Sequence, residues 1–157
     1  MKLTTKGKYG LYAMLYLARH EGEGPQSLSS MESLGVQPDY LEQLLGTLRR
    51  GGLVTTVRGA QGGYQLSRPS EQITVGDVIT ATEGPVNLSE CLSDEESCVR
   101  SNTCVSRRAW SYLSRQINRV LDSVTLRDVI TGQMEEPDEA LTDVPALLSK
   151  DHGERRA

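Results

Sequence analysis

Residues 38–66 read PDYLEQLLGTLRRGGLVTTVRGAQGGYQL, and this stretch decides the fold. Pro38 and the acidic residue after it suit the first turn of a helix, which we expect to run over residues 40–50. Its inner face carries leucines at helical spacing, namely Leu41, Leu44, Leu45 and Leu48. The glycine pair that follows Arg50 then ends the helix.

A short β-hairpin should come directly after this helix. Residues 53–57 alternate with β-branched side chains, residues 63–66 form a second strand, and the glycine-containing segment 58–62 turns tightly between them. Upstream, apolar spacing predicts two more helices, over residues 8–20 and 27–34. Helix, turn, helix and hairpin in this order are typical of a winged helix-turn-helix.

The second half of the chain predicts a short helix over residues 75–82, a loop over 84–104, and a long amphipathic helix from Val105. One stripe of the long helix is apolar and consists of Ala109, Leu113, Ile117, Val120, Leu121 and Val124. Such a stripe can pack inside one subunit, but a lone helix after a complete winged domain favours a partner subunit. Thr125 should start a short terminal helix that ends at Ile130.

The expected fold class is therefore mainly α with a small β-hairpin wing, a winged helix-turn-helix followed by a long C-terminal dimerisation helix. Four regions are predicted: a DNA-binding domain at 1–83, a cysteine-containing effector loop at 84–104, a dimerisation helix and short terminal helix at 105–132, and a disordered acidic tail at 133–157.

Charge is distributed unevenly along the chain, although the net charge is −4. Residues 1–70 hold eight Lys or Arg and five Asp or Glu, whereas residues 71–157 hold nine and sixteen. Phosphate contacts act over a Debye length of ~8–10 Å, so the basic N-terminal part governs binding to DNA. No apolar run approaches the ~18 residues that a membrane span needs, and no secretory leader is recognisable, so we expect a cytoplasmic protein without a membrane partner.

The first turns of the second helix of a helix-turn-helix enter the major groove of DNA. The side chains that can face outward there are Asp39, Tyr40, Glu42 and Gln43. Gln pairs with adenine and Glu accepts a hydrogen bond from cytosine, while Arg49 and Arg50 at the far end suit phosphates. Each of these side chains alone is equally typical of a solvated helix face, and only the succession of helix, hairpin and arginine tip favours DNA binding.

The hairpin tip is the second candidate DNA-binding element. Arg58 lies there beside Gly59, where the backbone can approach a ligand closely, and an arginine so placed suits a narrow minor groove. Lys2, Lys6 and Lys8 form a basic N-terminal arm for contacts with the DNA backbone.

Five segments together resemble the Rrf2 family of transcription regulators, namely residues 3–10, 40–44, 48–54, 58–64 and 73–79, the last followed by Glu83-Gly84-Pro85. The resemblance covers roughly residues 1–130. It implies a homodimer whose long helix crosses to the partner subunit, and binding of a palindromic operator in double-stranded DNA, mostly for repression. No nucleophile–base pair, phosphate loop or zinc-hydrolase spacing is present, so we do not expect an enzyme.

Three cysteines, Cys91, Cys98 and Cys104, lie within 14 residues. An odd, clustered set indicates metal or redox chemistry more than a disulfide scaffold, and three thiolates can hold an iron–sulfur cluster. The family resemblance implies a [2Fe–2S] cluster here, as in IscR-like members, with iron–sulfur, redox or nitric oxide status as the signal.

The fourth ligand is where this chain departs from the family pattern. Arg107 stands where IscR-like members have a histidine, and Lys8 stands where NsrR-like members have a carboxylate. The remaining candidates are Glu90, Asp94, Glu95, Glu96, a serine, a water molecule or an exogenous thiol. Zinc, thiol oxidation without metal and no role at all stay open. So does a cluster-free, CymR-like repressor of cysteine and sulfur metabolism that is controlled by a cysteine-biosynthesis enzyme.

Overall fold

The structure is a computed structural model, and it describes residues 4–92 and 104–134. Its α-helices are α1 (Thr5–Arg19), α2 (Pro38–Arg50), α3 (Val75–Glu83), α4 (Val105–Ser123) and α5 (Leu126–Thr131). Its 3₁₀ helices are η1 (Ser29–Leu34), η2 (Ser70–Gln72) and η3 (Glu90–Leu92), and its strands are β1 (Val54–Val57) and β2 (Gly63–Leu66). None of the helices in these ranges is long and apolar enough to span a bilayer. The expected class, mainly α with one β-hairpin, is confirmed.

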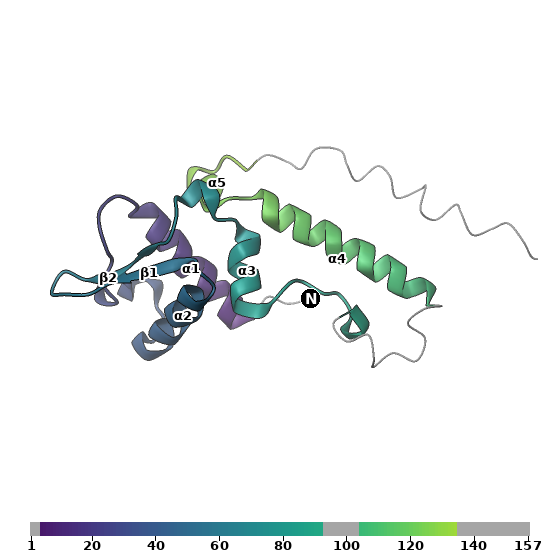
Figure 1. The fold of residues 1–157 in the computed structure, drawn as a ribbon, viewed down its shortest axis with the longest axis horizontal. Helices are drawn as coiled ribbons and strands as arrows, with labels where there is room; N and C mark the ends of the chain where they lie inside the picture. The colour runs from purple at the N-terminus through teal and green to yellow at the C-terminus, as the bar shows by residue number, and fades with distance from the viewer. Residues whose placement is uncertain (1–3, 93–103, 135–157) are drawn as a thin grey trace, which may run out of the picture.

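The hydrophobic core lies between α1, α2 and α3, next to the hairpin (Figure 1). The predicted inner face of α2 is correct, because all four of its leucines are at most 2% exposed. Met14 of α1, Met31 of η1 and Val78 of α3 complete the same core. Burying this leucine face fixes the opposite face of α2 toward the outside of the molecule.

The hairpin projects away from the helices (Figure 1), and a third segment pairs with β2. β1 and β2 pair antiparallel, with Val54 opposite Leu66 and Val57 opposite Gly63. Gln26 extends the sheet by one residue, since its backbone exchanges two hydrogen bonds of 2.8 Å with Tyr64. A Cβ on Gly63 would collide with the carbonyl oxygen of Gln26, so glycine is needed where these backbones meet.

Two helices differ most from the sequence prediction, one in type and one in where it begins. The segment expected as a helix over 27–34 contains a 3₁₀ helix at Ser29–Leu34, because the serines bond to nearby backbone groups. Ser27 Oγ accepts from the N–H of Ser30, whose own hydroxyl donates to the carbonyl oxygen of Ser27.

The first helix, expected over 8–20, begins at Thr5, so Lys6 and Lys8 lie on a helix rather than on an arm. The cause is a cap from a distant element. Glu83, the last residue of α3, accepts hydrogen bonds from Thr4 N–H (3.0 Å), Thr4 Oγ1 (2.6 Å) and Gly7 N–H (2.9 Å). These bonds satisfy backbone N–H groups that the start of any helix leaves unpaired, and the negative charge suits that end of the helix dipole.

The C-terminal helix α5 returns to the N-terminal part of the chain, where it packs against α1 and η2. Two backbone hydrogen bonds secure the return: Val75 N–H donates to Val124 O at 2.8 Å, and Leu126 N–H donates to Ile73 O at 2.9 Å. Leu126 is completely buried in the same core as Ile73. At the start of α5, hydrogen bonds from Thr125 hold the pKa of Asp128 below its ordinary value.

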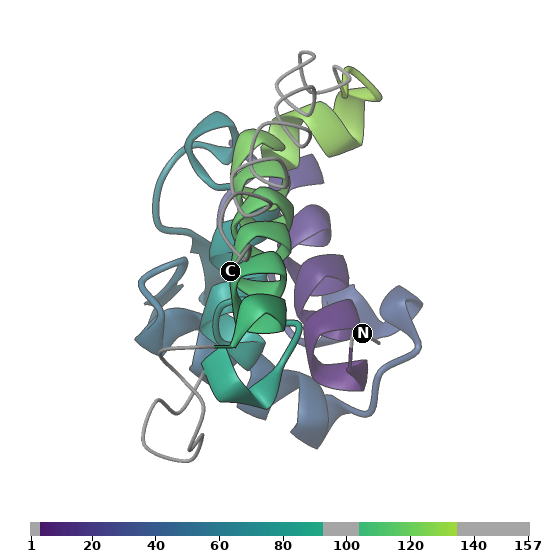
Figure 2. The same ribbon diagram turned by 90° about the vertical axis from the view of Figure 1, so that its right-hand side faces the viewer.

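The long helix α4 extends away from the core and packs against α3 (Figures 1 and 2). Its inner face also binds the segment that follows α3. Ser114 Oγ accepts from Leu88 N–H at 3.0 Å, and the Asn118 side chain bonds to both the N–H (3.1 Å) and the C=O (2.9 Å) of Val86. Residues 86–88, which lead toward Cys91, are therefore held against α4 by hydrogen bonds.

Candidate nucleic-acid interface and cysteine segment

The outer face of α2 lines one side of an open pocket with a volume of about 800 Å³. We call it the α2 surface. Its lining residues are Lys6 from α1 and, from α2, Asp39, Tyr40, Glu42, Gln43, Leu44, Gly46, Thr47 and Arg50. Six of the nine residues predicted to bind DNA are thus brought together in one place.

Tyr40 joins this surface to α1, because it is half-buried and its ring packs edge-on against the ring of Tyr9. The centroids of Tyr9 and Tyr40 lie 6.4 Å apart, and those of Tyr9 and Tyr12 lie 6.0 Å apart. Lys8 places its ammonium 5.7 Å from the Tyr12 centroid, a cation–π arrangement. These contacts fix α1 and α2 relative to each other, so that Lys6 and Gln43 belong to one rigid surface.

The remaining predicted residues lie outside the α2 surface. Arg49 is exposed on α2 without lining the hollow. Arg58 and Gly59 are exposed at the hairpin tip. Gly59 has φ of 121° and its carbonyl oxygen accepts from Gly62 N–H at 3.0 Å, which closes a turn that other residues would strain to make.

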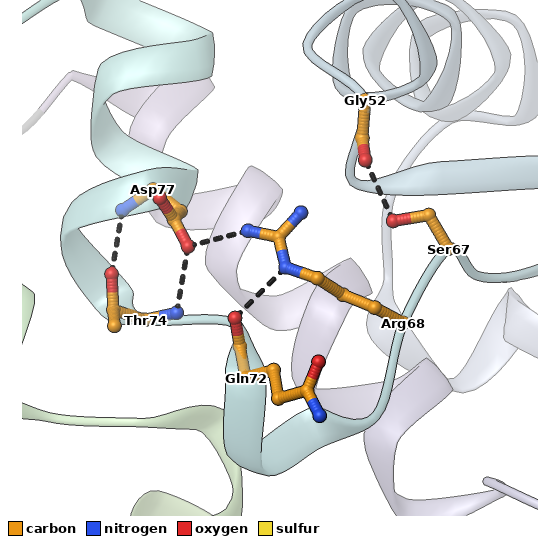
Figure 3. Close-up of polar contacts among 6 residues, drawn as sticks. All are labelled: Gly52, Ser67, Arg68, Gln72, Thr74 and Asp77. Carbon is orange, nitrogen blue, oxygen red and sulfur yellow. Dashed lines mark hydrogen bonds and ion pairs between the residues drawn. The ribbon is translucent and has the colours of Figure 1, made fainter.

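A polar network fixes the hairpin to the rest of the domain (Figure 3). Just after β2, Ser67 Oγ donates to Gly52 O at 2.6 Å, which ties the hairpin to the end of α2. Arg68 donates from Nε to Gln72 O and from Nη2 to Asp77 Oδ2, both at 2.8 Å. Asp77 in turn accepts from Thr74 N–H at 3.1 Å and so caps α3. The exit from the hairpin is therefore held against the first turn of α3.

Two of the three cysteines lie in the described ranges, and Cys98 lies outside them, as do Asp94, Glu95 and Glu96. Cys91 is half-buried in η3, with its Sγ 3.1 Å from Ser89 Oγ. Cys104 is half-buried directly before α4, with its Sγ 3.1 Å from Ser106 Oγ. Because η3 packs against α4 near its N-terminal end (Figure 1), both thiols belong to the same end of that helix.

Further donors around these thiols are sparse among the residues that the structure describes. No group of three His, Cys, Asp or Glu side chains there is arranged to hold a metal ion. Glu90 is exposed beside Cys91, and Arg107 lies one turn into α4. The described part of the chain thus supplies two thiols and one nearby carboxylate.

A family model described as Rrf2, iron-dependent transcriptional regulator, matches residues 3–132. The chain belongs to the Rrf2 family. The HTH-type transcriptional regulator CymR of Bacillus subtilis is 44% identical over 130 residues, which cover 82% of this chain and 89% of CymR. The HTH-type transcriptional regulator IscR of Yersinia pseudotuberculosis is 40% identical over 134 residues, which cover 85% of this chain and 81% of IscR.

Solved structures agree with this assignment. The structure of CymR, described as the global cysteine regulator of B. subtilis, matches with a TM-score of 0.70 at 39% identity and covers 83% of this chain and 97% of that one. The structure of T. potens IscR matches with a TM-score of 0.67 at 42% identity, and the match covers 87% of this chain and 93% of that one. This Rrf2 protein is a helix-turn-helix transcriptional regulator, and its relatives confirm that it is not an enzyme.

Three residues that line the α2 surface of this Rrf2 protein were not predicted there: Leu44, which was expected on the inner face, and Gly46 and Thr47. A signal was present, because Gly46 follows Asp39 by seven residues and Gln43 by three, which places all three on one face of a helix. Glycine and threonine were overlooked since neither is a typical base-reading side chain.

Proposed function

We propose that this protein represses transcription by binding a palindromic operator as a homodimer. The α2 surface enters the major groove in each half-site, and Arg58 at the hairpin tip enters the adjacent minor groove. The observation that carries this proposal is the α2 surface itself, which gathers side chains from α1 and α2 around one hollow.

The chemistry of the α2 surface supports base reading. Lys6 and Arg50 donate hydrogen bonds, Asp39 and Glu42 accept them, and Gln43 does both. Base edges in the major groove present a mixed pattern of donors and acceptors, whereas phosphates present acceptors only. A surface that mixes both signs of charge is therefore suited to base edges.

The outer face of α4 supports the homodimer. Trp110, Leu113 and Val120 are 42%, 43% and 39% exposed, although all three are large and apolar. Together with Ile117 and Val124 they follow one another at intervals of three and four residues, the spacing of a coiled-coil seam. We call this row the α4 seam. A second copy of α4 would cover it and would set the two reading helices about one DNA turn, ~34 Å, apart.

Glu42→Ala and Arg58→Ala should each lower operator affinity about tenfold or more, because each removes a proposed groove contact. The measurement is fluorescence anisotropy with operator duplexes selected from the organism's own genome by the wild-type protein. Glu32→Ala and Arg127→Ala are matched controls, since they remove the same charges from exposed positions outside the α2 surface and the hairpin. Wild-type affinity in both Glu42→Ala and Arg58→Ala would refute the proposed groove contacts.

We further propose that Cys91, Cys98 and Cys104 hold an iron–sulfur cluster, and that its state controls operator binding. Support comes from the description of the family as iron-dependent and from the two described thiols at one end of α4. A bound cluster would supply a centre that can be oxidised or lost. Either event would change the charge of the cysteine-containing segment, residues 91–104. The backbone bonds of residues 86–88 to α4 provide a physical route from that segment to the α4 seam.

The close match to CymR favours a second candidate, a cluster-free repressor controlled by thiol oxidation or by a cysteine-biosynthesis enzyme. Anaerobic reconstitution with iron and sulfide separates the two. A cluster should give visible absorption bands and stoichiometric iron and sulfide, and Cys98→Ser should abolish the colour. A featureless spectrum after reconstitution would refute the cluster and leave the CymR-like function.

A further inference from the structure

The guanidinium of Arg50 folds back over α2 instead of extending away from its C-terminal end. Its Nη2 donates to Thr47 Oγ1 at 3.0 Å, and Thr47 Oγ1 donates to the carbonyl oxygen of Gln43 at 3.1 Å. The other terminal nitrogen, Nη1, lies 3.8 Å from the point where a Cβ on Gly46 would stand. Arg50 therefore lies across Gly46 and lines the α2 surface.

Gly46 has no role in the fold that would require glycine. It is the ninth of 13 helical residues, and it is absent from the residues with positive φ. An added Cβ would meet only that guanidinium nitrogen, at an ordinary van der Waals distance. Glycine inside a helix costs about 0.5–1 kcal/mol relative to alanine. What it provides here is open space on the outer face of α2, beside the guanidinium of Arg50.

Arg50 also keeps its charge available for a ligand. Within residues 4–92 and 104–134, the ion pair of the structure joins Arg68 to Asp77, and no carboxylate lies within ion-pair distance of Arg50. The bond to Thr47 uses one of the five N–H donors of the guanidinium, and the planar fork that suits two acceptors side by side is retained.

We propose that Arg50 reads a guanine in each half-site of the operator through O6 and N7, with Thr47 as its positioning residue and Gly46 leaving room for the base edge. The inference rests on the proposed function and replaces the phosphate contact expected for Arg50 from its place at the end of the helix. Arg49, which does not line the α2 surface, remains the phosphate contact.

The test compares affinity for a set of operator duplexes in which every half-site position is changed in turn. Arg50→Ala should lose discrimination at one position of each half-site, by about tenfold to a hundredfold, and keep it at the others. Arg50→Lys should lose the same discrimination yet keep the salt dependence, because lysine retains the charge but not the fork. Thr47→Val should weaken discrimination at that same position.

Arg49→Ala is the matched control, since it removes an identical side chain from the neighbouring residue. It should weaken binding to all duplexes alike and reduce the slope of log affinity against log salt by about one per contact. The same uniform loss for Arg50→Ala, or unchanged binding, would overturn the guanine assignment while the proposed operator function stands. A wild-type protein without any sequence preference would overturn both.

Discussion

Leu113→Asp is expected to convert the protein to a monomer and to lower operator affinity about a hundredfold or more. Leu113 is 43% exposed and lies in the α4 seam between Trp110 and Ile117. A carboxylate there would have to be buried without a partner in the dimer, which costs several kcal/mol. A monomer binds each half-site separately and loses the gain of about 10²- to 10⁴-fold that linked sites provide.

Arg115→Gln is the matched control for this experiment. It changes the net charge by the same amount, lies two residues away on α4, and belongs to the flank opposite the α4 seam, where Arg115 bonds to Ser111. Sedimentation velocity gives the oligomeric state, circular dichroism gives the helix content, and anisotropy gives the affinity. A folded Leu113→Asp dimer with wild-type affinity would show that the subunits meet elsewhere.

Leu126→Ala is expected to lower the free energy of unfolding by about 2–5 kcal/mol, the cost of removing a buried leucine and leaving a cavity. Leu126 is 0% exposed although α5 has only six residues. The loss should appear in the same single transition that unfolds α1 and α2, because all of them share one core.

Urea unfolding followed by circular dichroism measures this loss, at one fixed protein concentration because a dimer is more stable when concentrated. Arg127→Ala, at the next and exposed position of α5, should change the free energy by no more than about 0.5 kcal/mol. A loss below about 1 kcal/mol for Leu126→Ala would mean that α5 is not part of the core.

Local patterns predicted most of the fold. The leucine spacing of residues 41–48 was enough to orient α2, because burial of one face leaves only the opposite face for a ligand. The hairpin was correct to within one residue, since glycine and β-branched residues mark it directly. The start of α1 at Thr5 was missed because its N-cap, Thr4, is supported by the carboxylate of Glu83, which is 79 residues away in the sequence.

The candidate sites were predictable in composition but not in arrangement. Charge and spacing identified Asp39, Glu42 and Gln43, yet the bond between Thr47 and Arg50 depends on a rotamer that no sequence pattern encodes. Likewise, the spacing of the cysteines identifies soft ligands. It does not reveal that Cys91 and Cys104 lie at one end of α4, because that depends on the packing of η3 against α4.

The burial of Leu126 beside Ile73 has a consequence for synthesis of the protein. The elements proposed to read DNA end at residue 66, but the core beneath them is completed by a side chain 60 residues further along. A nascent chain emerging from the ribosome therefore leaves Ile73 and the side of α1 that packs against α5 uncovered until α5 has been translated. During that interval the uncovered apolar surface favours binding by chaperones.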